Sequence, residues 1–110
     1  MIGHILQGIA GRKDDAHKPP VARGCIHAFP RALSAVSEVS AAGARKYTWD
    51  GWRSVDDAAT RYADAQMRHE LAIARGELID PETGYPHLAH IAWNALARLE
   101  LSMVAAEGLS

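Results

Sequence analysis

Apolar residues recur with a helical period from residue 30 onwards. The repeating positions, spaced by three or four residues, are Leu33, Val36, Ser40 and Gly43. This spacing is typical of one face of an amphipathic helix. Pro30 stands where the first turn of a helix tolerates proline. We therefore predict a helix over residues 30–46.

A second helical pattern follows a loop that is marked by Gly51 and by the pair Trp49 and Trp52. Ser54 can cap its first turn, and Asp56 and Asp57 stand where the positive end of the helix dipole favours carboxylates. Gly76 is a natural stop, because glycine readily adopts the left-handed conformation that ends many helices. We expect this helix at about residues 55–75.

The third pattern begins after Pro86 and ends near Gly108, which predicts a helix at about residues 87–106. No stretch alternates with period two, so no strand is expected. The predicted fold class is all-α, a small helical bundle. The helices at 55–75 and 87–106 form an antiparallel hairpin, because only a short turn joins them.

The residues before this bundle are predicted to form an irregular N-terminal arm over residues 1–29. Lys18 is followed by two prolines, which prevent a continuous helix. Residues 1–11 lack a basic n-region, so we do not interpret them as a signal peptide. Residues 30–110 are expected to form one domain.

Composition limits the class of protein further. At 110 residues a monomer buries little apolar surface, and the chain contains many alanines but one Phe. Burial between subunits would compensate, so we expect a homo-oligomer. The charge is balanced, with 12 Lys and Arg against 13 Asp and Glu, a net charge of -1. This balance gives no indication of binding to a nucleic acid polymer or to an anionic membrane.

Cysteine use and hydropathy point to the cytoplasm. Cys25 is the single cysteine, which excludes an intrachain disulfide framework and a zinc site built on thiolates. No apolar run reaches the roughly 18 residues of a membrane span. We therefore expect a cytoplasmic protein without a membrane partner.

The most informative segment is the start of the third predicted helix. At about 100° per residue, His87, His90 and Asn94 fall within about 60° of one another. The remaining surface of this helix is largely apolar. Because imidazole and amide groups are costly to bury without partners, they are expected to line a site or hold a metal. The alternative is a pair of hydrogen-bonded histidines with a structural role.

The hairpin geometry brings further candidates to the same place. The predicted neighbours are His69, Glu70, Glu77, Asp80 and Glu82. Carboxylate and imidazole ligands suit Mg²⁺, Mn²⁺ or Zn²⁺, and imidazole favours the transition metals. For Glu70 and Glu77 the alternative is a solvated helix face, and for Asp80 a turn before Pro81. A satisfied core histidine is the default interpretation of His69.

Cations and aromatic residues near the second helix could bind a nucleotide. Arg61 and Arg68 share one face of the predicted helix, and the arginine fork suits phosphate oxygens. Lys18 and Lys46 could act in the same way. The aromatic residues that could stack on a base are Tyr47, Trp49 and Trp52. The alternatives are a solvated or ion-paired surface for the cations and a loop anchor for the aromatic residues.

These residues occur in an order that resembles a phage-associated family, the dATP/dGTP diphosphohydrolase N-terminal domain. The segments that carry the resemblance are Lys13-Asp14 with Lys18-Pro19, Gly43-Ala44-Arg45-Lys46-Tyr47, Trp52, Arg68-His69, Gly76-Glu77, Asp80-Pro81-Glu82-Thr83-Gly84 and His87-Leu88-Ala89-His90. The resemblance spans about residues 12–104. The family is similar to the all-α MazG/HisE-type nucleotide pyrophosphohydrolases, which hold divalent metals with acidic residues on helices.

The resemblance implies an enzyme that converts dATP or dGTP to the monophosphate and pyrophosphate in the cytoplasm of a phage host. The implied metal ligands are Glu77, Asp80, His87 and His90. Glu70, Glu77 and Glu82 are candidate catalytic carboxylates. The candidate substrate-binding residues are Lys18, Lys46, Tyr47, Trp52, Arg61 and Arg68.

A second hypothesis is a non-catalytic module that binds a nucleotide or a protein. It is motivated by His87 and His90, which stand where MazG-like helices carry an acidic pair. A functional site requires both imidazoles to face a cavity shared with Glu77 or Asp80. Metal-binding imidazoles also need an acceptor on their second nitrogen; the predicted acceptors are Glu70 and Asn94.

Overall fold

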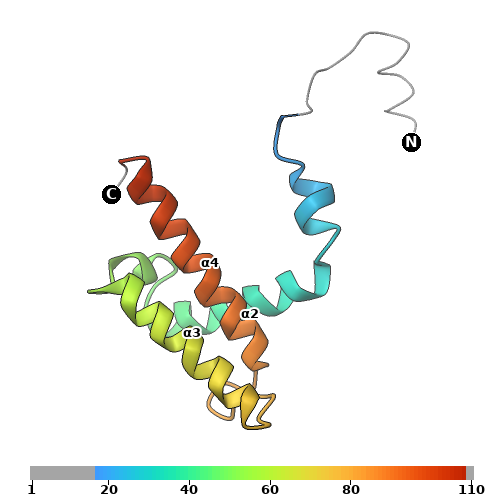
Figure 1. The fold of residues 1–110 in the computed structure, drawn as a ribbon, viewed down its shortest axis with the longest axis vertical. Coiled ribbons are helices and arrows are strands. Elements are labelled where there is room, and N and C mark those ends of the chain that lie inside the picture. Colours follow the sequence, from blue (N-terminus) through green and yellow to red (C-terminus); the bar gives the residue numbers. More distant parts are fainter. Residues whose placement is uncertain (1–16, 109–110) are drawn as a thin grey trace. The chain divides into compact units, whose positions relative to one another are not determined.

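The computed structural model describes residues 17–108 (Figure 1). The chain divides into two units, Met1–Pro30 and Arg31–Ser110. In the first unit, the segment predicted to be irregular contains a short π-helix, η1 (Ala22–Ile26). The prediction was wrong there because Val21 already has helical backbone angles directly after the prolines, so they mark the start of the turn. The predictions for residues 1–16 lie outside the described residues.

Helix α2 (Pro30–Lys46) has the predicted bounds. Its apolar spacing places Val39 in the interior at 8% exposure. The hydroxyl of Ser40 accepts a hydrogen bond of 2.8 Å from the indole Nε1 of Trp93. This bond joins α2 to the last helix of the chain.

The start of the next helix differs from the prediction. Ser54 ends a 3-10 helix, η2 (Gly51–Ser54), and α3 (Ala58–Ala74) begins only after it. Asp57 precedes α3 with a left-handed φ of 54°, and its side chain makes no capping hydrogen bond. The predicted cap at Ser54 was therefore wrong. The helix ends as expected, before Gly76 with its φ of 94°.

Helix α4 (His87–Ala106) follows Pro86 and ends before Gly108, which has a φ of 73°. The connection from α3 is tight, because Ile79 and Pro86 form an isolated bridge and the N–H of His87 donates to the carbonyl of Leu78 at 3.0 Å. Helices α3 and α4 run antiparallel and side by side (Figure 1). The all-α prediction and the helix hairpin are confirmed.

The interior of the unit Arg31–Ser110 is small and partly polar. The buried residues are Val39, Ala72, His87, Ala89, His90, Asn94 and Ala97. Three of these are polar, so their side chains need hydrogen-bond partners.

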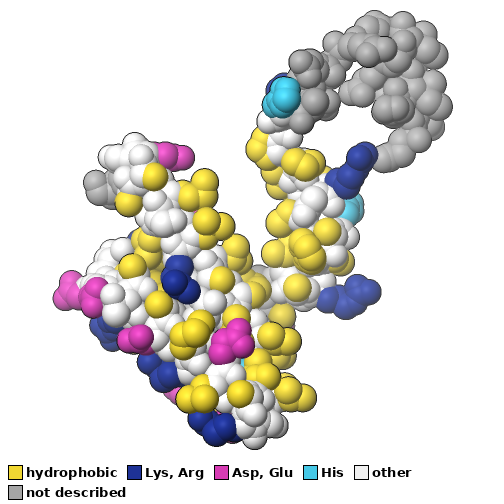
Figure 2. Space-filling view, viewed as in Figure 1, with side chains coloured by type: hydrophobic (Ala, Val, Ile, Leu, Met, Phe, Trp, Pro, Cys, Tyr) yellow, Lys and Arg dark blue, Asp and Glu magenta, His cyan; other side chains and the backbone are white. Residues whose placement is uncertain are grey.

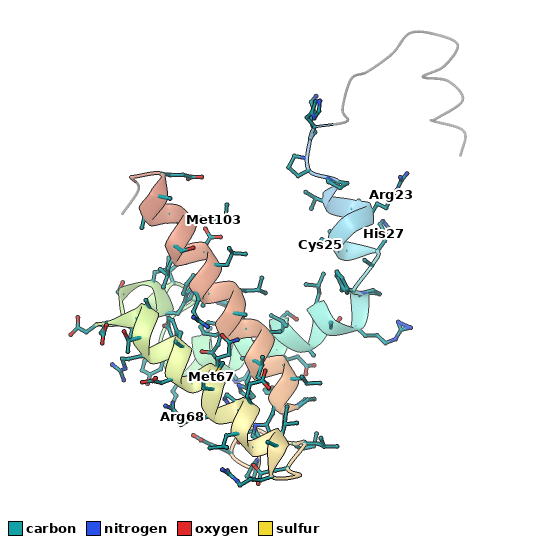
Figure 3. The ribbon with its side chains drawn as sticks, viewed as in Figure 1. Arg23, Cys25, His27, Met67, Arg68 and Met103 are labelled. Atoms are coloured by element: carbon teal, nitrogen blue, oxygen red, sulfur yellow. The ribbon has the colours of Figure 1, made fainter. Side chains whose placement is uncertain are left out.

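Large apolar side chains remain exposed along α4. They are Leu88, Leu96, Leu99 and Met103, each between 49% and 67% exposed. Figure 2 shows hydrophobic side chains gathered over α4, and Figure 3 shows Met103 on its outer surface. Within residues 17–108, no helix is long and apolar enough to cross a membrane.

Candidate functional site

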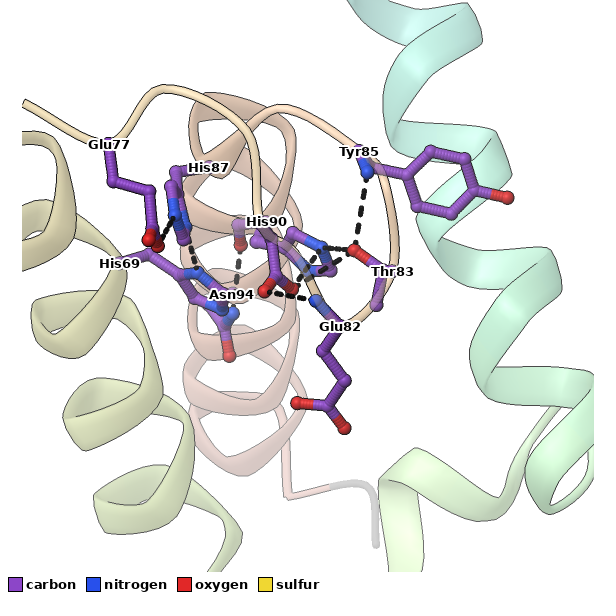
Figure 4. Close-up of polar contacts among 9 residues, drawn as sticks. His69, Glu77, Glu82, Thr83, Tyr85, His87, His90 and Asn94 are labelled. Atoms are coloured by element: carbon purple, nitrogen blue, oxygen red, sulfur yellow. Dashed lines mark hydrogen bonds and ion pairs between the residues drawn. The ribbon is translucent and has the colours of Figure 1, made fainter.

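The loop end of the α3–α4 hairpin holds a network of imidazoles and carboxylates (Figure 4). His87, only 3% exposed, is at its centre. Its Nε2 lies 2.8 Å from Oε1 of Glu77, and its Nδ1 lies 2.8 Å from Nδ1 of His69. If Nε2 of His87 donates to Glu77, Nδ1 of His87 can accept a hydrogen bond from Nδ1 of His69. The three residues therefore form a continuous chain of hydrogen bonds.

His90 forms a second branch of the network. Its Nε2 lies 2.8 Å from the hydroxyl oxygen of Thr83 and 3.4 Å from Oδ2 of Asp80. The ring of His69 stacks on the ring of His90, with 4.5 Å between centroids and 5° between planes. His69 thus contacts both other histidines, because it projects from α3 toward the first turns of α4.

The turn at Asp80 explains how the loop supplies these groups. Oδ1 of Asp80 accepts a hydrogen bond from the backbone N–H of Glu82 at 3.1 Å, and Oδ2 accepts one from the Thr83 hydroxyl at 3.0 Å. The N–H of Tyr85 donates to the Thr83 oxygen at 3.3 Å. An aspartate before proline commonly forms such a turn. Asp80 therefore shapes the loop and faces His90 at the same time.

Burial and neighbouring charges set the protonation of the network. Burial, assisted by His90 and His87, lowers the pKa of His69. Burial also lowers the pKa of His90, although Asp80 opposes this effect. Burial would raise the pKa of Asp80, but hydrogen bonds from Glu82 and Thr83 and the nearby imidazoles hold it below its usual value. Near pH 7, His69 and His90 are therefore neutral and Asp80 is ionised.

The structure brings together some of the predicted residues and leaves others outside. His87 pairs with Glu77, and His90 lies against Asp80, so both imidazoles are turned away from bulk solvent. Glu70 is exposed and has no hydrogen bond to either imidazole among the described contacts. Only the backbone of Glu82 joins the network, and its carboxylate points away from the imidazoles (Figure 4).

Glu70 and Asn94 were predicted to accept hydrogen bonds from the second ring nitrogens of His87 and His90, and this prediction was wrong. The side-chain N–H of Asn94 donates to the carbonyl of His90 at 2.8 Å, one turn back in the same helix. The second nitrogen of His87 instead meets His69. In residues 17–108, no group of three or more His, Cys, Asp or Glu side chains is arranged to hold a metal ion. Most of the imidazole nitrogens and carboxylate oxygens that could bind a metal already form hydrogen bonds within the network.

A cavity of about 850 Å³ lies beside the hairpin, next to this network. Residues from α2, the loop after it, α3 and α4 line this cavity. They are Ser40, Gly43, Ala44, Tyr47, Thr48, Trp49, Gly51, Trp52, Val55, Asp56, Arg61, Tyr62, Ala65, Arg68 and Trp93. Five aromatic side chains and two arginines therefore surround one space.

Three of the aromatic rings form a packed wall. The ring centroids of Trp52 and Trp93 are 5.8 Å apart, and those of Tyr62 and Trp93 are 5.4 Å apart. Both pairs meet edge to face, an arrangement that aromatic quadrupoles favour. The hydroxyl of Tyr62 donates to the carbonyl of Trp52 at 2.6 Å. By contrast Tyr47 and Trp49, also in the lining, are 74% and 68% exposed.

Four of the six predicted substrate-binding residues line the cavity: Tyr47, Trp52, Arg61 and Arg68. Lys46 is the last residue of α2 and is not part of the lining. Lys18 belongs to the other unit, Met1–Pro30. Tyr62 and Trp93 were missed as lining residues. Their only signal was spacing, since Tyr62 directly follows Arg61 and Trp93 lies one turn after His90.

The cavity and the imidazole network are neighbours along both helices. Arg68 lines the cavity, and the next residue, His69, belongs to the network. On α4, His90 and Trp93 are one turn apart, an axial rise of about 4.5 Å. A ligand that extends from the aromatic wall past Arg68 would therefore approach the network.

Comparison with known proteins identifies one family. A family model described as dATP/dGTP diphosphohydrolase, N-terminal, matches residues 8–108, nearly the whole chain. No curated protein and no solved structure matches the chain significantly.

Proposed function

The chain belongs to the dATP/dGTP diphosphohydrolase N-terminal family, and we propose that it hydrolyses a purine deoxynucleoside triphosphate to the monophosphate and pyrophosphate. The observation that carries this proposal is the aromatic cavity of about 850 Å³ with Arg61 and Arg68 in its lining. Its volume falls within the range of small-molecule sites. Aromatic rings suit a purine base, and guanidinium groups suit phosphate oxygens.

The proposed roles follow from where the side chains lie. Trp52 and Tyr47 contact the base, since both line the cavity and Tyr47 is exposed. Arg61 and Arg68 hold the phosphates, and their fixed charge offsets the charge that develops on the phosphoryl oxygens. Lys18 and Lys46 do not line the cavity, and their contact with phosphate stays a prediction.

A proton acceptor lies next to the phosphate-binding end. When Glu77 accepts a hydrogen bond from His87 and His87 accepts one from His69, Nε2 of His69 keeps its lone pair. The lowered pKa of His69 keeps this imidazole unprotonated near pH 7. We propose that the chain of Glu77, His87 and His69 takes the proton of the attacking water. Glu70 and Glu82 are weaker candidates, because neither carboxylate joins the network.

The predicted divalent metal, Mg²⁺ or Mn²⁺ with Zn²⁺ as the alternative, does not fit the imidazole network as a ready-made protein site. Nε2 of His87 is taken by Glu77, and Nε2 of His90 by Thr83. We derive no step through a metal at Glu77, Asp80, His87 and His90. A requirement for metal remains a prediction, since Mg²⁺ often arrives with a triphosphate and uses only one or two protein carboxylates.

The test is a pyrophosphate-release assay with the eight common ribo- and deoxynucleoside triphosphates, with Mg²⁺ or Mn²⁺ and with EDTA. We expect multiple turnovers with dATP or dGTP that stop in EDTA and are lost in Glu77→Gln and in His90→Ala. Glu100→Gln, an exposed carboxylate of α4 outside the network, is the matched control. Absence of pyrophosphate from every nucleotide with either metal rejects the enzyme.

The alternative is a non-catalytic nucleotide-binding or protein-interaction module of phage origin. It is favoured by the network, whose donors and acceptors satisfy one another and leave no preformed metal site in residues 17–108. Calorimetry with a non-hydrolysable dGTP analogue, together with the assay above, distinguishes the enzyme from the binding module. Tight binding without turnover supports the module.

We also propose that the protein is a homo-oligomer of the cytoplasm. The exposed apolar residues of α4 form a face that a second subunit could cover. Burying such side chains contributes about 25 cal/mol per Å². Sedimentation of the wild type and of Leu99→Lys tests this proposal, since a monomeric wild type would contradict it.

A further inference from the structure

One carboxylate stands out in the lining of the cavity. Asp56 is the only acidic side chain among the described residues that line it, where the other charged side chains are Arg61 and Arg68. Within residues 17–108 the ion pairs and side-chain hydrogen bonds do not involve Asp56. Its oxygens are therefore open to a ligand, unlike those of Asp80, which both accept hydrogen bonds.

The charges of the cavity are ordered along the chain. Asp56 lies before the first turn of α3, whereas Arg61 and Arg68 lie within α3, two turns apart on one face. Two turns correspond to an axial distance of about 10.5 Å. A triphosphate is attracted to the arginines and repelled by a carboxylate. A bound nucleotide therefore places its phosphates along α3 and its base near Asp56.

A carboxylate can only accept hydrogen bonds, and it accepts two parallel ones well. The Watson–Crick edge of guanine presents two adjacent donors, N1–H and the 2-amino group. Adenine presents a lone pair at N1, which an ionised carboxylate repels. A site whose polar group is left without its partner discriminates strongly between such ligands.

We propose that Asp56 reads the N1–H and 2-amino edge of guanine, and so makes this site select guanine over adenine nucleotides. The inference rests on the proposed function, because it assigns the base of the same substrate. It gives Trp52 and Tyr47 a different task from Asp56: the two rings hold any purine by stacking, and the carboxylate distinguishes between purines.

The experiment compares dGTP, dITP and dATP. Hypoxanthine keeps N1–H but lacks the 2-amino group, so dITP isolates one of the two hydrogen bonds. For the wild type we expect kcat/KM to fall by about tenfold from dGTP to dITP and by more than that from dGTP to dATP. In Asp56→Asn the ratio of dGTP to dATP should fall by about tenfold or more. Asp64→Asn, an exposed carboxylate of α3 outside the lining, should leave the ratio unchanged.

The failures are distinguishable. A wild type that turns over dGTP and dATP equally overturns the inference and leaves the proposed function intact. So does Asp56→Asn if it slows both nucleotides alike, because that result assigns Asp56 to the phosphates or their metal. If nothing is turned over, calorimetry with the non-hydrolysable dGTP and dATP analogues measures the same preference. Absence of binding by either analogue rejects both proposals.

Discussion

Two neighbouring regions of the α3–α4 hairpin treat polar side chains in opposite ways. At the loop end, His69, His87 and His90 have hydrogen-bond partners and are largely shielded from water. In the adjacent cavity, Arg61 and Arg68 are part of the lining and make no ion pair among the described residues. Satisfied polar groups hold a fold together, whereas polar groups left open beside aromatic walls are available to a ligand. Within one helix pair, the imidazole network is therefore expected to contribute to stability, and the cavity to ligand recognition.

The variant with the largest expected effect on this comparison is His87→Ala, which tests whether the network stabilises the fold. Removing the imidazole leaves Glu77 and His69 without their central partner, and a broken buried network commonly costs about 2–4 kcal/mol. We expect a loss of that size in the free energy of unfolding, measured in urea at pH 7.5. Glu70→Ala, which removes an exposed side chain of α3, should cost less than about 0.5 kcal/mol. Equal losses in the two variants would show that the network contributes nothing special to stability.

Arg68→Ala tests the cavity. A charge-assisted hydrogen bond is worth about 1.5–3 kcal/mol, so affinity for a non-hydrolysable dGTP analogue should fall by about tenfold to a hundredfold. The free energy of unfolding should change by less than about 0.5 kcal/mol, because the side chain is exposed. Arg75→Ala, at the end of α3 and outside the cavity, is the matched control for calorimetry. Undiminished binding by Arg68→Ala would remove the phosphate role.

The smallest expected effect is a pH dependence confined to the network. The folded-state pKa values of His69 and His90 lie below that of an unfolded histidine. The unfolded chain therefore binds more protons between the two values, and stability falls as the pH drops through about 6.5. The groups that face His69 are His87, His90, Asp80 and Arg68. Asp80, with its lowered pKa, adds a second loss only below about pH 4.

Urea midpoints between pH 8 and pH 5 measure this effect. We expect the midpoint to decrease below pH 6.5 in the wild type and to decrease less in His69→Gln, which cannot acquire charge there. A wild-type midpoint that stays constant from pH 7.5 to pH 5.5 would contradict the burial of neutral imidazoles.

The sequence predicted the helices better than it predicted the contacts. The bounds of α2 and α4 follow from apolar period and from the glycine and proline residues that flank them. The start of α3 did not follow, because Asp57 adopts a left-handed conformation that composition does not indicate. Local spacing encodes helices, whereas an isolated backbone reversal depends on how the loop before it packs.

The same limit applies to the candidate site. The hairpin geometry correctly brought His87 to Glu77 and His90 to Asp80. It did not show that His69 would bond to His87 or that Thr83 would bond to His90. These contacts depend on side-chain rotamers and on a loop bent by Asp80. Similarly, the place of Trp93 in the cavity depends on its contacts with Ser40, Trp52 and Tyr62, which lie far from it in the sequence.

The tryptophans of the cavity give the protein a built-in optical reporter. The chain has three tryptophans, and Trp49, Trp52 and Trp93 all line the one cavity. Its tryptophan emission therefore originates from this one place. The exposed Trp49 and the packed pair of Trp52 and Trp93 emit from environments of different polarity. We therefore expect a ligand that fills the cavity to change the tryptophan fluorescence of the protein, with no label and no mutation.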